Sequence, residues 1–480
     1  MRTRQHGGVT TSVPDRPEPG DVLELTAGEA VHGGWCVARP ASGPAVFVRH
    51  ALPGERVLAV ITQRTSKLAR ADATEILQAS PDRVPPPCPH AHPGGCGGCD
   101  WQHASLPAQR SLKAAVVRQQ LRRIAGIDWD VCVEPMPAEQ HGLGWRTRVT
   151  FAVGHDGVAG LRRHRSHDVM EIGDCPIAHP LVAAAAATKR TWPDAAWVEV
   201  AAAPGSGQRA VIIGGDAPAS EIAADTVLTQ RTGRTGQTGR GRPGRPGRSG
   251  QSGRTGHAGP AKVVRGTGYL RQRAAGRDWR VSAAGFWQVH PQAADTLAAA
   301  VLDALQPQPG EVALDLYCGA GLFAGVLADA VGPSGTVIGI EADPAAVRDA
   351  RHNLRATPWA RVHRGDAALV LARNGLSGAS LAVADPPRTG LARPVIDLLS
   401  APSPPVQGNH ASDGPQGDHA SGGGQIRRIA YVSCDPATLA RDIALLRGAG
   451  WTLDALRGFD AFPMTHHVEC LATLSRTPNA

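Results

Sequence analysis

The residues best suited to covalent chemistry lie near the C-terminal end of the sequence. Cys434 follows an apolar run in Val-Ser-Cys-Asp-Pro, and Glu469 precedes the last apolar stretch. A cysteine between a strand end and a helix start can have a lowered thiol pKa, although a single cysteine is more often a small buried apolar side chain. A thiolate with a nearby carboxylate suits addition to an enone-like ring followed by removal of a proton.

Three further groups of residues could bind or orient a ligand. Asp385 opens Asp-Pro-Pro-Arg, in which two prolines fix the backbone beside a carboxylate, although a turn with a capping side chain is an alternative. Gly319 and Gly321 belong to a loop whose backbone can approach a ligand at a helix N-terminus. Glu341 lies twenty residues past Gly321 and could bind two ribose hydroxyls. Because this arrangement also fits a dinucleotide-binding loop, a nicotinamide dehydrogenase is a competing interpretation.

The elements around these residues alternate between helix and apolar strand. We expect a helix and four strands at 293–305, 312–316, 336–341, 381–385 and 429–434. This alternation predicts a mostly parallel, doubly wound α/β sheet. In such sheets ligands bind at the carboxyl ends of the strands, where Gly319, Glu341, Asp385 and Cys434 would converge.

The first part of the chain is predicted to be all-β. Short strands at 22–25, 45–48 and 56–61 fit a five-stranded barrel of the OB type, which often binds nucleic acid, although a plain structural β-domain is the alternative. A basic helix is expected from 107 to 125, with Leu112, Val116, Leu121 and Ile124 near helical spacing. Residues 130–227 mix short strands with alanine-rich helix.

Four of the nine cysteines could hold a metal centre. Cys88, Cys96 and Cys99 lie in a Pro- and Gly-rich stretch, and Cys175 follows in Gly-Asp-Cys-Pro. Four thiolates suffice for a [4Fe-4S] cluster or for a tetrahedral zinc ion, and the spacing alone does not separate the two.

The positive charge of the chain is concentrated in one segment. The formal net charge is +8, and residues 228–262 hold seven arginines, one lysine and no acid. This low-complexity stretch is predicted to be a disordered basic insertion that could attract RNA weakly, although a tolerated surface insertion is as good an explanation. A second flexible insertion is expected at 401–425.

Composition limits the class of protein. The 480 residues include 42% hydrophobic ones, which excludes a wholly disordered chain, while 57 Gly and 39 Pro predict long irregular stretches. No apolar run approaches the roughly 20 residues needed to cross a bilayer, and the N-terminus lacks the apolar region of a secretory signal. We therefore expect a cytoplasmic protein without membrane contact.

Taken together, these motifs resemble the RNA 5-methyluridine (uracil-C5) methyltransferases, over nearly the whole chain. The resemblance rests on Asp385-Pro-Pro-Arg-x-Gly-Leu, Ser433-Cys434-Asp-Pro and His467-x-Glu469, in this order. It implies S-adenosylmethionine as cofactor and assigns to it Gln288, Tyr317, Gly319, Gly321, Glu341, Asp366 and Asp385. It further implies that Cys434 attacks C6 of a flipped-out uracil, that C5 accepts the methyl group, and that Glu469 removes the C5 proton.

The resemblance also implies an organisation and a substrate. Residues 18–80 resemble an RNA-binding TRAM domain, 81–282 a small α+β iron–sulfur domain, and 283–480 a class I (Rossmann-like) methyltransferase domain on which helix 107–125 could pack. The ribosomal branch of the family carries a [4Fe-4S] cluster at the matching cysteines, which favours this cluster over zinc at Cys88, Cys96, Cys99 and Cys175. The TRAM domain and the cluster together favour 23S ribosomal RNA as substrate. A transfer RNA methyltransferase and an inactive RNA-binding protein remain alternatives. We expect a monomer.

Overall fold

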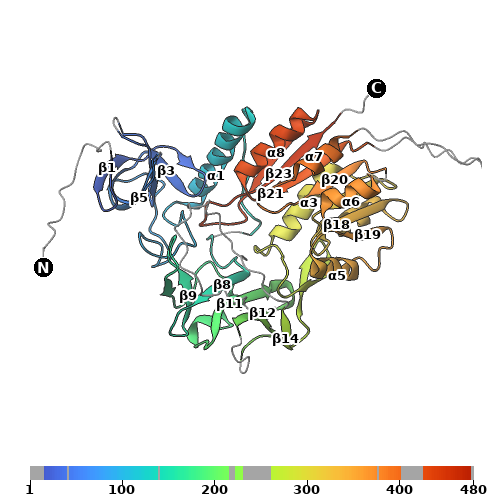
Figure 1. Cartoon of the computed structure of the whole chain (residues 1–480), viewed down its shortest axis with the longest axis horizontal. Helices are drawn as coiled ribbons and strands as arrows, with labels where there is room; N and C mark the ends of the chain where they lie inside the picture. Colours follow the sequence, from blue (N-terminus) through green and yellow to red (C-terminus); the bar gives the residue numbers. More distant parts are fainter. Residues whose placement is uncertain are drawn as a thin grey trace, which may run out of the picture.

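Four sheets contain the strands of the part of the chain that the computed structural model describes (Figure 1). These residues are 16–40, 43–66, 68–138, 141–215, 222–230, 261–375, 378–401 and 425–476. Most of the predicted insertions lie outside them: residues 231–260 of the first and 402–424 of the second.

The first sheet closes into a barrel. Its order is β1-β5-β6-β4-β3-β2, and its strands are β1 (Val22–Thr26), β2 (Ala30–Val31), β3 (Trp35–Ala38), β4 (Val46–Arg49), β5 (Arg56–Arg64) and β6 (Ala69–Gln78). Beyond β1, the Gly28 amide donates to the Val37 carbonyl at 3.0 Å and the Val37 amide donates to the Glu29 carbonyl at 2.9 Å. Gly28 and Glu29 continue the chain from β1, and Val37 belongs to β3. These bonds therefore join the first and last strands of the order β1-β5-β6-β4-β3 and close the barrel. The N-terminal β-structure is therefore present, with the two-residue β2 added to it.

Helix α1 (Leu106–Gln120) joins the barrel to the rest of the molecule. Its N-cap is Ser105, with proline in the first turn, and it continues into the π-helical turn η1 (Leu121–Ala125). Val116 packs into the barrel core, whereas Val117 and Leu121 pack into the core of the largest sheet. Ile124 was expected on the apolar face but is 41% exposed, because a π-helical turn changes the angular position of the residues that follow it.

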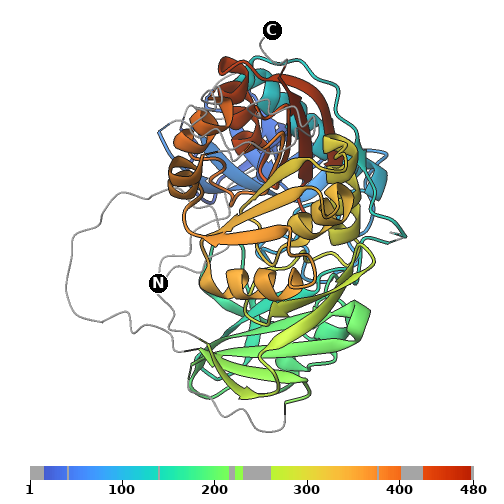
Figure 2. The same ribbon diagram turned by 90° about the vertical axis from the view of Figure 1, so that its right-hand side faces the viewer.

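A second sheet and a hairpin occupy the middle of the sequence. The sheet has the order β10-β9-β8-β11-β12-β13-β14, and the hairpin pairs β15 with β16. Its strands are β8 (Arg148–Val153), β9 (Ala159–Arg162), β10 (Val169–Glu171), β11 (Ala195–Ala203), β12 (Gln208–Gly215), β13 (Thr226–Gln230) and β14 (Lys262–Arg265), and the hairpin is β15 (Tyr269–Ala274) and β16 (Arg277–Ser282). Figure 2 shows this part, in green, as a layer separate from the largest sheet.

In this middle part, the helix content and the bounds of the basic insertion differ from those predicted. The alanine-rich stretch forms only the short α2 (Pro180–Ala183), followed by the 3-10 turns η2 (Ala187–Lys189) and η3 (Pro204–Ser206). Ala186 adopts a φ of +52°, a left-handed conformation that ends the helical run. The boundaries of the basic insertion also differ, since Leu228 and Lys262 both lie in paired strands, β13 and β14.

The largest sheet has the order β19-β18-β17-β20-β21-β23-β22-β7. Its strands are β7 (Val133–Glu134), β17 (Val312–Leu316), β18 (Thr336–Glu341), β19 (Ala360–Arg364), β20 (Leu381–Ala384), β21 (Arg428–Ser433), β22 (Thr452–Phe459) and β23 (Glu469–Ser475). The predicted parallel sheet is confirmed from β19 to β21, and β23 then enters antiparallel to β21. The edge strand β7 comes from residues that the sequence assigned to the central part.

Helices cover both faces of this sheet, as a doubly wound fold requires. They are α3 (Ala293–Leu305), α4 (Leu322–Val331), α5 (Pro344–Asn353), α6 (Ala367–Asn374), α7 (Arg393–Ser400) and α8 (Pro436–Gly448). Leu297 of α3 and Leu327 of α4 belong to one buried cluster, whereas Ile396 of α7 and Ile443 of α8 belong to the other. Within the described residues, no helix is both long and apolar enough to cross a membrane.

Candidate active site

Cys434 and Glu469 face each other at the carboxyl end of β21. In the antiparallel pair of β21 and β23, Ser433 lies opposite Cys470. Cys434 follows Ser433 and Glu469 precedes Cys470, so the register brings the thiol and the carboxyl together. Glu469 is 4% exposed, and Cys434 is partly buried. The two residues that the sequence selected for covalent chemistry are thus neighbours, although 35 positions separate them.

Asp385 lies beside this pair. It follows β20, whose last residue Ala384 pairs with Leu316 of β17 and with Tyr431 of β21. Burial raises the pKa of Asp385 to about 7. Burial also raises the pKa of Glu469 well above its usual value, the charge of Asp385 adds to this, and Arg388 opposes it. Two carboxyl groups that share a poorly hydrated space resist ionising together.

The thiol of Cys434 differs from the expectation of a lowered pKa. Burial is the largest cause and raises the pKa of Cys434 to about 12, with Glu469 adding to the effect and Arg388 opposing it. Cys434 does lie just before the N-terminus of α8, but loss of hydration and the neighbouring carboxyl groups outweigh that position. The free protein therefore holds a thiol here, and formation of the thiolate requires a change in these surroundings.

The loop after Asp385 is fixed against α8. Asp442 of α8 is fully buried and accepts hydrogen bonds from the Leu391 amide at 2.8 Å and from the Tyr431 hydroxyl at 2.7 Å. Gly390 has a φ of +77°, and a Cβ there would lie 2.3 Å from an Asp442 oxygen and 2.4 Å from Thr438. Only glycine allows this close approach, so the Asp-Pro-Pro-Arg segment is held at the site by a buried acid that the sequence analysis did not select.

The loop between β17 and α4 has the form of a ligand-binding turn. Gly321, with a φ of +92°, caps α4, and a Cβ on it would lie 3.3 Å from Ala350. Tyr317 has a φ of +65°, which is unusual for a non-glycine residue. The Gly319 amide donates to Glu341 Oε2 at 3.0 Å, and the Asp343 amide donates to Oε1 at 2.7 Å. Each Glu341 oxygen keeps a lone pair that could accept from a hydroxyl.

Asp315, one residue before the end of β17, is a site residue that the sequence analysis missed. It is fully buried, and its Oδ2 accepts from the Ala324 amide at 2.7 Å. Its Oδ1 is buried and has no hydrogen-bond partner among the described residues. Burial raises the pKa of Asp315 well above its usual value, and the charges of Asp385 and Glu341 add to this. An acid inside the apolar run Val-Ala-Leu-Asp-Leu was the available signal.

These carboxyl groups fit a cationic ligand. Asp315, Glu341 and Asp385 follow or end three neighbouring strands, β17, β18 and β20, and their mutual repulsion favours a positive group among them. S-adenosylmethionine carries a sulfonium and an ammonium group, so the residues present suit it.

The two remaining residues predicted to contact the cofactor lie on different loops. Asp366 caps α6, where its Oδ1 accepts from the Leu369 amide at 3.1 Å, and the preceding Gly365 amide donates to the Glu341 carbonyl at 2.9 Å. Gln288 is partly buried between β16 and α3. The carbonyl of its neighbour Val289 accepts at 2.9 Å from both the amide and the hydroxyl of Thr147. Because Thr147 directly precedes β8, these bonds fix the Gln288 loop to the sheet that contains β8.

The four selected cysteines lie near enough to influence one another electrostatically. Burial raises the pKa of Cys96 and of Cys175, and in both cases the Cys88 thiol adds to the effect; Cys99 is raised by burial and then by Cys175 and Cys96. All four are free thiols. Among the residues described, no three Cys, His, Asp or Glu side chains form a group able to hold one metal ion.

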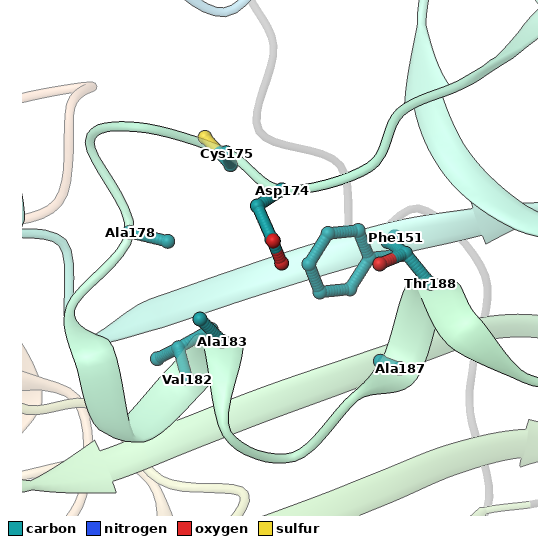
Figure 3. Close-up of a pocket in the computed structure, with 8 residues that line it drawn as sticks. All are labelled: Phe151, Asp174, Cys175, Ala178, Val182, Ala183, Ala187 and Thr188. Carbon is teal, nitrogen blue, oxygen red and sulfur yellow. The ribbon is translucent and has the colours of Figure 1, made fainter.

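Figure 3 shows the surroundings of Cys175. Cys175 lines a cavity of about 10 Å³ together with Asp174, Phe151 and Thr188. The Cys175 sulfur points away from the Phe151 ring. A space of that size accommodates about one water molecule, so this cavity is not a substrate site.

Comparison with known proteins bears on both the fold and the site. The family model for tRNA (Uracil-5-)-methyltransferase matches residues 424–477, and the model for Protein-L-isoaspartate(D-aspartate) O-methyltransferase matches residues 287–371. An uncharacterized RNA methyltransferase of Streptomyces avermitilis is 44% identical over 470 residues, covering 95% of this chain and 98% of its own length. Another from Streptomyces coelicolor is 45% identical, covering 95% and 93%.

A solved structure shares the architecture. The tRNA (uracil-54, C5)-methyltransferase of Pyrococcus abyssi, in complex with S-adenosyl-L-homocysteine, aligns with a TM-score of 0.65 at 21% identity. The alignment covers 94% of this chain and 99% of that one. The class I methyltransferase fold, with β-structure added at the N-terminus, is therefore common to both proteins.

Proposed function

Since this chain belongs to the S-adenosylmethionine-dependent RNA (uracil-5) methyltransferases, we propose that it methylates C5 of a uridine in 23S ribosomal RNA. The observation that carries the proposal is the pair of Cys434 and Glu469, which face each other where β21 and β23 meet. This pair lies beside a row of carboxyl groups suited to a cationic cofactor.

In the proposed mechanism the two residues act in turn. The Cys434 sulfur adds to C6 of the uracil as its thiol proton passes to solvent, and the electron pair of the C5–C6 double bond moves into the enolate, which makes C5 nucleophilic. S-adenosylmethionine, when bound, supplies the methyl group that C5 accepts. Glu469 in its carboxylate form, which a cationic ligand beside these carboxyl groups favours, then takes the proton from C5. The electron pair left at C5 restores the C5–C6 double bond as the bond between Cys434 and C6 breaks. Asp315, Glu341 and Asp385 would hold the cationic groups of the cofactor, and Gln288, Tyr317, Gly319, Gly321 and Asp366 would complete its site. The target base must leave its stack, which costs least in a loop.

The choice of ribosomal RNA has two supports. The barrel formed by residues 22–78 resembles an RNA-binding TRAM domain, and the four gathered cysteines resemble those of the ribosomal branch. Nucleoside mass spectrometry tests the choice: undermodified ribosomal and transfer RNA are each incubated with the protein and S-adenosylmethionine. We expect new 5-methyluridine in ribosomal RNA. If 5-methyluridine appears in transfer RNA alone, the substrate is transfer RNA and not ribosomal RNA. If neither RNA gains a methyl group, the result favours an RNA-binding protein without activity.

We further propose that Cys88, Cys96, Cys99 and Cys175 hold a [4Fe-4S] cluster. Their thiols lie close enough to influence one another's pKa, and the mechanism assigns the cluster no redox step. Iron, sulfide and zinc analysis of anaerobically purified protein is the test. Cys175→Ser should lose iron and visible absorbance, whereas Cys132→Ser, at an exposed cysteine outside the set, should keep both. Zinc in place of iron would overturn the assignment.

We also propose that the protein is a cytoplasmic monomer. Sedimentation of the purified chain at micromolar concentration is expected to give the mass of one chain, 49.9 kDa.

A further inference from the structure

The loop between β22 and β23 ends at Glu469 and is held by residues from the distant α1 region. Lys113 of α1 is fully buried and donates to Asp460 Oδ1, at the start of the loop, and to the Phe462 carbonyl at 3.0 Å. The Asp460 amide donates to the Glu134 carbonyl in β7 at 2.8 Å. The two contacts of Lys113 join residues about 350 positions apart in the sequence.

Met464 lies in the middle of this loop, and its backbone is constrained. It has a φ of +68°, a left-handed conformation that is strained for a side chain of this kind. Its amide donates to Gln109 Oε1 at 2.7 Å, and its carbonyl accepts from the amides of Asp100 and Trp101, both at 3.1 Å. Gln109 is fully buried. A strained conformation persists only where the surroundings hold it in place, and here both backbone groups are held.

A second contact holds the end of the loop nearest the site. His466 Nδ1 lies 2.5 Å from Asp100 Oδ2, and the His466 amide donates to the same oxygen at 3.4 Å. His466 is three residues before Glu469. The loop is therefore fixed at its start by Lys113, at its middle by Gln109, and near its end by Asp100.

We propose that Asp100, Gln109 and Lys113 are positioning residues for Glu469, which they align with the C5 proton by holding the loop Asp460–Val468. The inference rests on the proposed function of Glu469. None of the three belongs to the catalytic pair, and the mechanism gives none of them a chemical role. Loosening the loop disturbs proton removal and leaves in place the attack by Cys434, which lies between β21 and α8 and not on this loop. The expected defect is thus a stall after methyl transfer.

The experiment uses the full chain, uridine-containing target RNA and methyl-labelled S-adenosylmethionine in a rapid-quench series. Gln109→Met preserves the volume of the buried side chain and removes the acceptor of the Met464 amide. We expect methyl transfer within about threefold of the parent, product release slowed by about tenfold or more, and labelled covalent protein–RNA complex accumulating. His466→Ala, at a partly exposed position, removes the side-chain contact with Asp100 together with the ring contacts to His467 and His32, and keeps the amide bond to Asp100. It should show the same stall to a smaller degree.

Controls separate positioning from general damage. Ser111→Ala lies on the exposed side of α1 between Gln109 and Lys113 and should release product at the parent rate. Gln109→Glu retains the acceptor oxygen for the Met464 amide but loses the Nε2 donor to the Ala104 carbonyl, so it should release product faster than Gln109→Met and more slowly than the parent. If both Gln109→Met and His466→Ala turn over without a stall, or lose formation of the covalent complex instead, the inference is overturned. If the parent protein forms no methylated product, the proposed function itself fails.

Discussion

Cys434 and Glu469 divide the proposed reaction into two steps that substitution can separate. Cys434→Ala removes the nucleophile, so methylation should fall by roughly 10⁴-fold or more and no covalent complex should form with 5-fluorouridine RNA. Denaturing gels with labelled RNA measure the complex. Cys470→Ala, at the fully buried neighbour on β23, is the control for packing. Surviving activity in Cys434→Ala would discard the nucleophile assignment.

Glu469→Gln should accumulate the covalent protein–RNA complex that Cys434→Ala cannot form. The amide cannot remove the C5 proton, but attack and methyl transfer should continue, so methylated RNA should remain attached to the protein. Labelled methyl groups in a denaturation-resistant complex measure this stall. Free turnover by Glu469→Gln at the parent rate would mean that another group acts as the base.

Asp385 connects the site to pH. Burial raises its pKa to about 7, so its carboxyl is mostly neutral at pH 6 and mostly ionised at pH 8. A cationic cofactor favours the ionised form, and the affinity for S-adenosylmethionine should therefore rise by about tenfold between these pH values. Calorimetric titration measures it. Asp385→Asn should bind weakly with a smaller dependence on pH than the parent, since Asp315 and Glu469 still titrate. A pH dependence equal to the parent's would assign the effect to these other groups.

At the scale of elements, α8 holds the loop that follows Asp385. Asp442 lies in the helix interior and accepts bonds from the Leu391 amide, the Tyr431 hydroxyl and Arg441 Nε. Its carboxyl therefore ties one helix, one strand and one loop together at the edge of the site. The identity of Gly390 follows from the same packing, since the carboxyl occupies the space that a Cβ would need.

Asp442→Ala leaves buried donors without an acceptor. We expect a loss of about 3 kcal/mol in the free energy of unfolding, together with reduced methylation, because the Asp-Pro-Pro-Arg loop loses its anchor. Tyr431→Phe removes one of the bonds and should cost about 1 kcal/mol. Urea denaturation of both variants measures the difference. Equal stabilities for the two variants would show that the Leu391 contact contributes little.

At the scale of the whole molecule, α1 packs against the barrel and against the largest sheet at once. Val116 contacts one core and Val117 the other, and Figure 1 shows α1 beside α8. Because the same helix carries Gln109 and Lys113, the loop before Glu469 depends on the placement of α1 between these two parts.

The basic insertion is expected to matter for RNA affinity alone. Thr229 of β13 pairs with Lys262 of β14, so residues 231–260 can be replaced by an Asn-Gly turn that joins the two strands. We expect an unchanged melting temperature and an unchanged rate at saturating RNA. RNA affinity should fall severalfold at low salt, with little change at high salt. Replacing the seven arginines by glutamine in the intact chain separates charge from length. Loss of folding in the shortened chain would contradict the prediction.

The sequence by itself determined the parallel sheet and the residues at its carboxyl edge. Apolar strands such as 312–316 and 381–384 are buried on both faces, so their composition marks them without knowledge of their neighbours. Asp385, Cys434 and Glu469 could be selected because each stands directly beside such a strand. The helix at 293–305 was likewise visible, since its buried residues recur at helical spacing.

The tertiary structure decided what depends on burial and on contacts between distant residues. It reversed the expected shift in the pKa of Cys434, because the desolvation of a thiol depends on packing and not on sequence position. It also revealed Asp315, Asp442, Gln109 and Lys113, whose roles come from partners elsewhere in the chain. The alanine-rich stretch after Pro180 formed a single helical turn, since local propensity yields to the strands around it. A motif shows which residues can do chemistry, and packing decides their protonation and position.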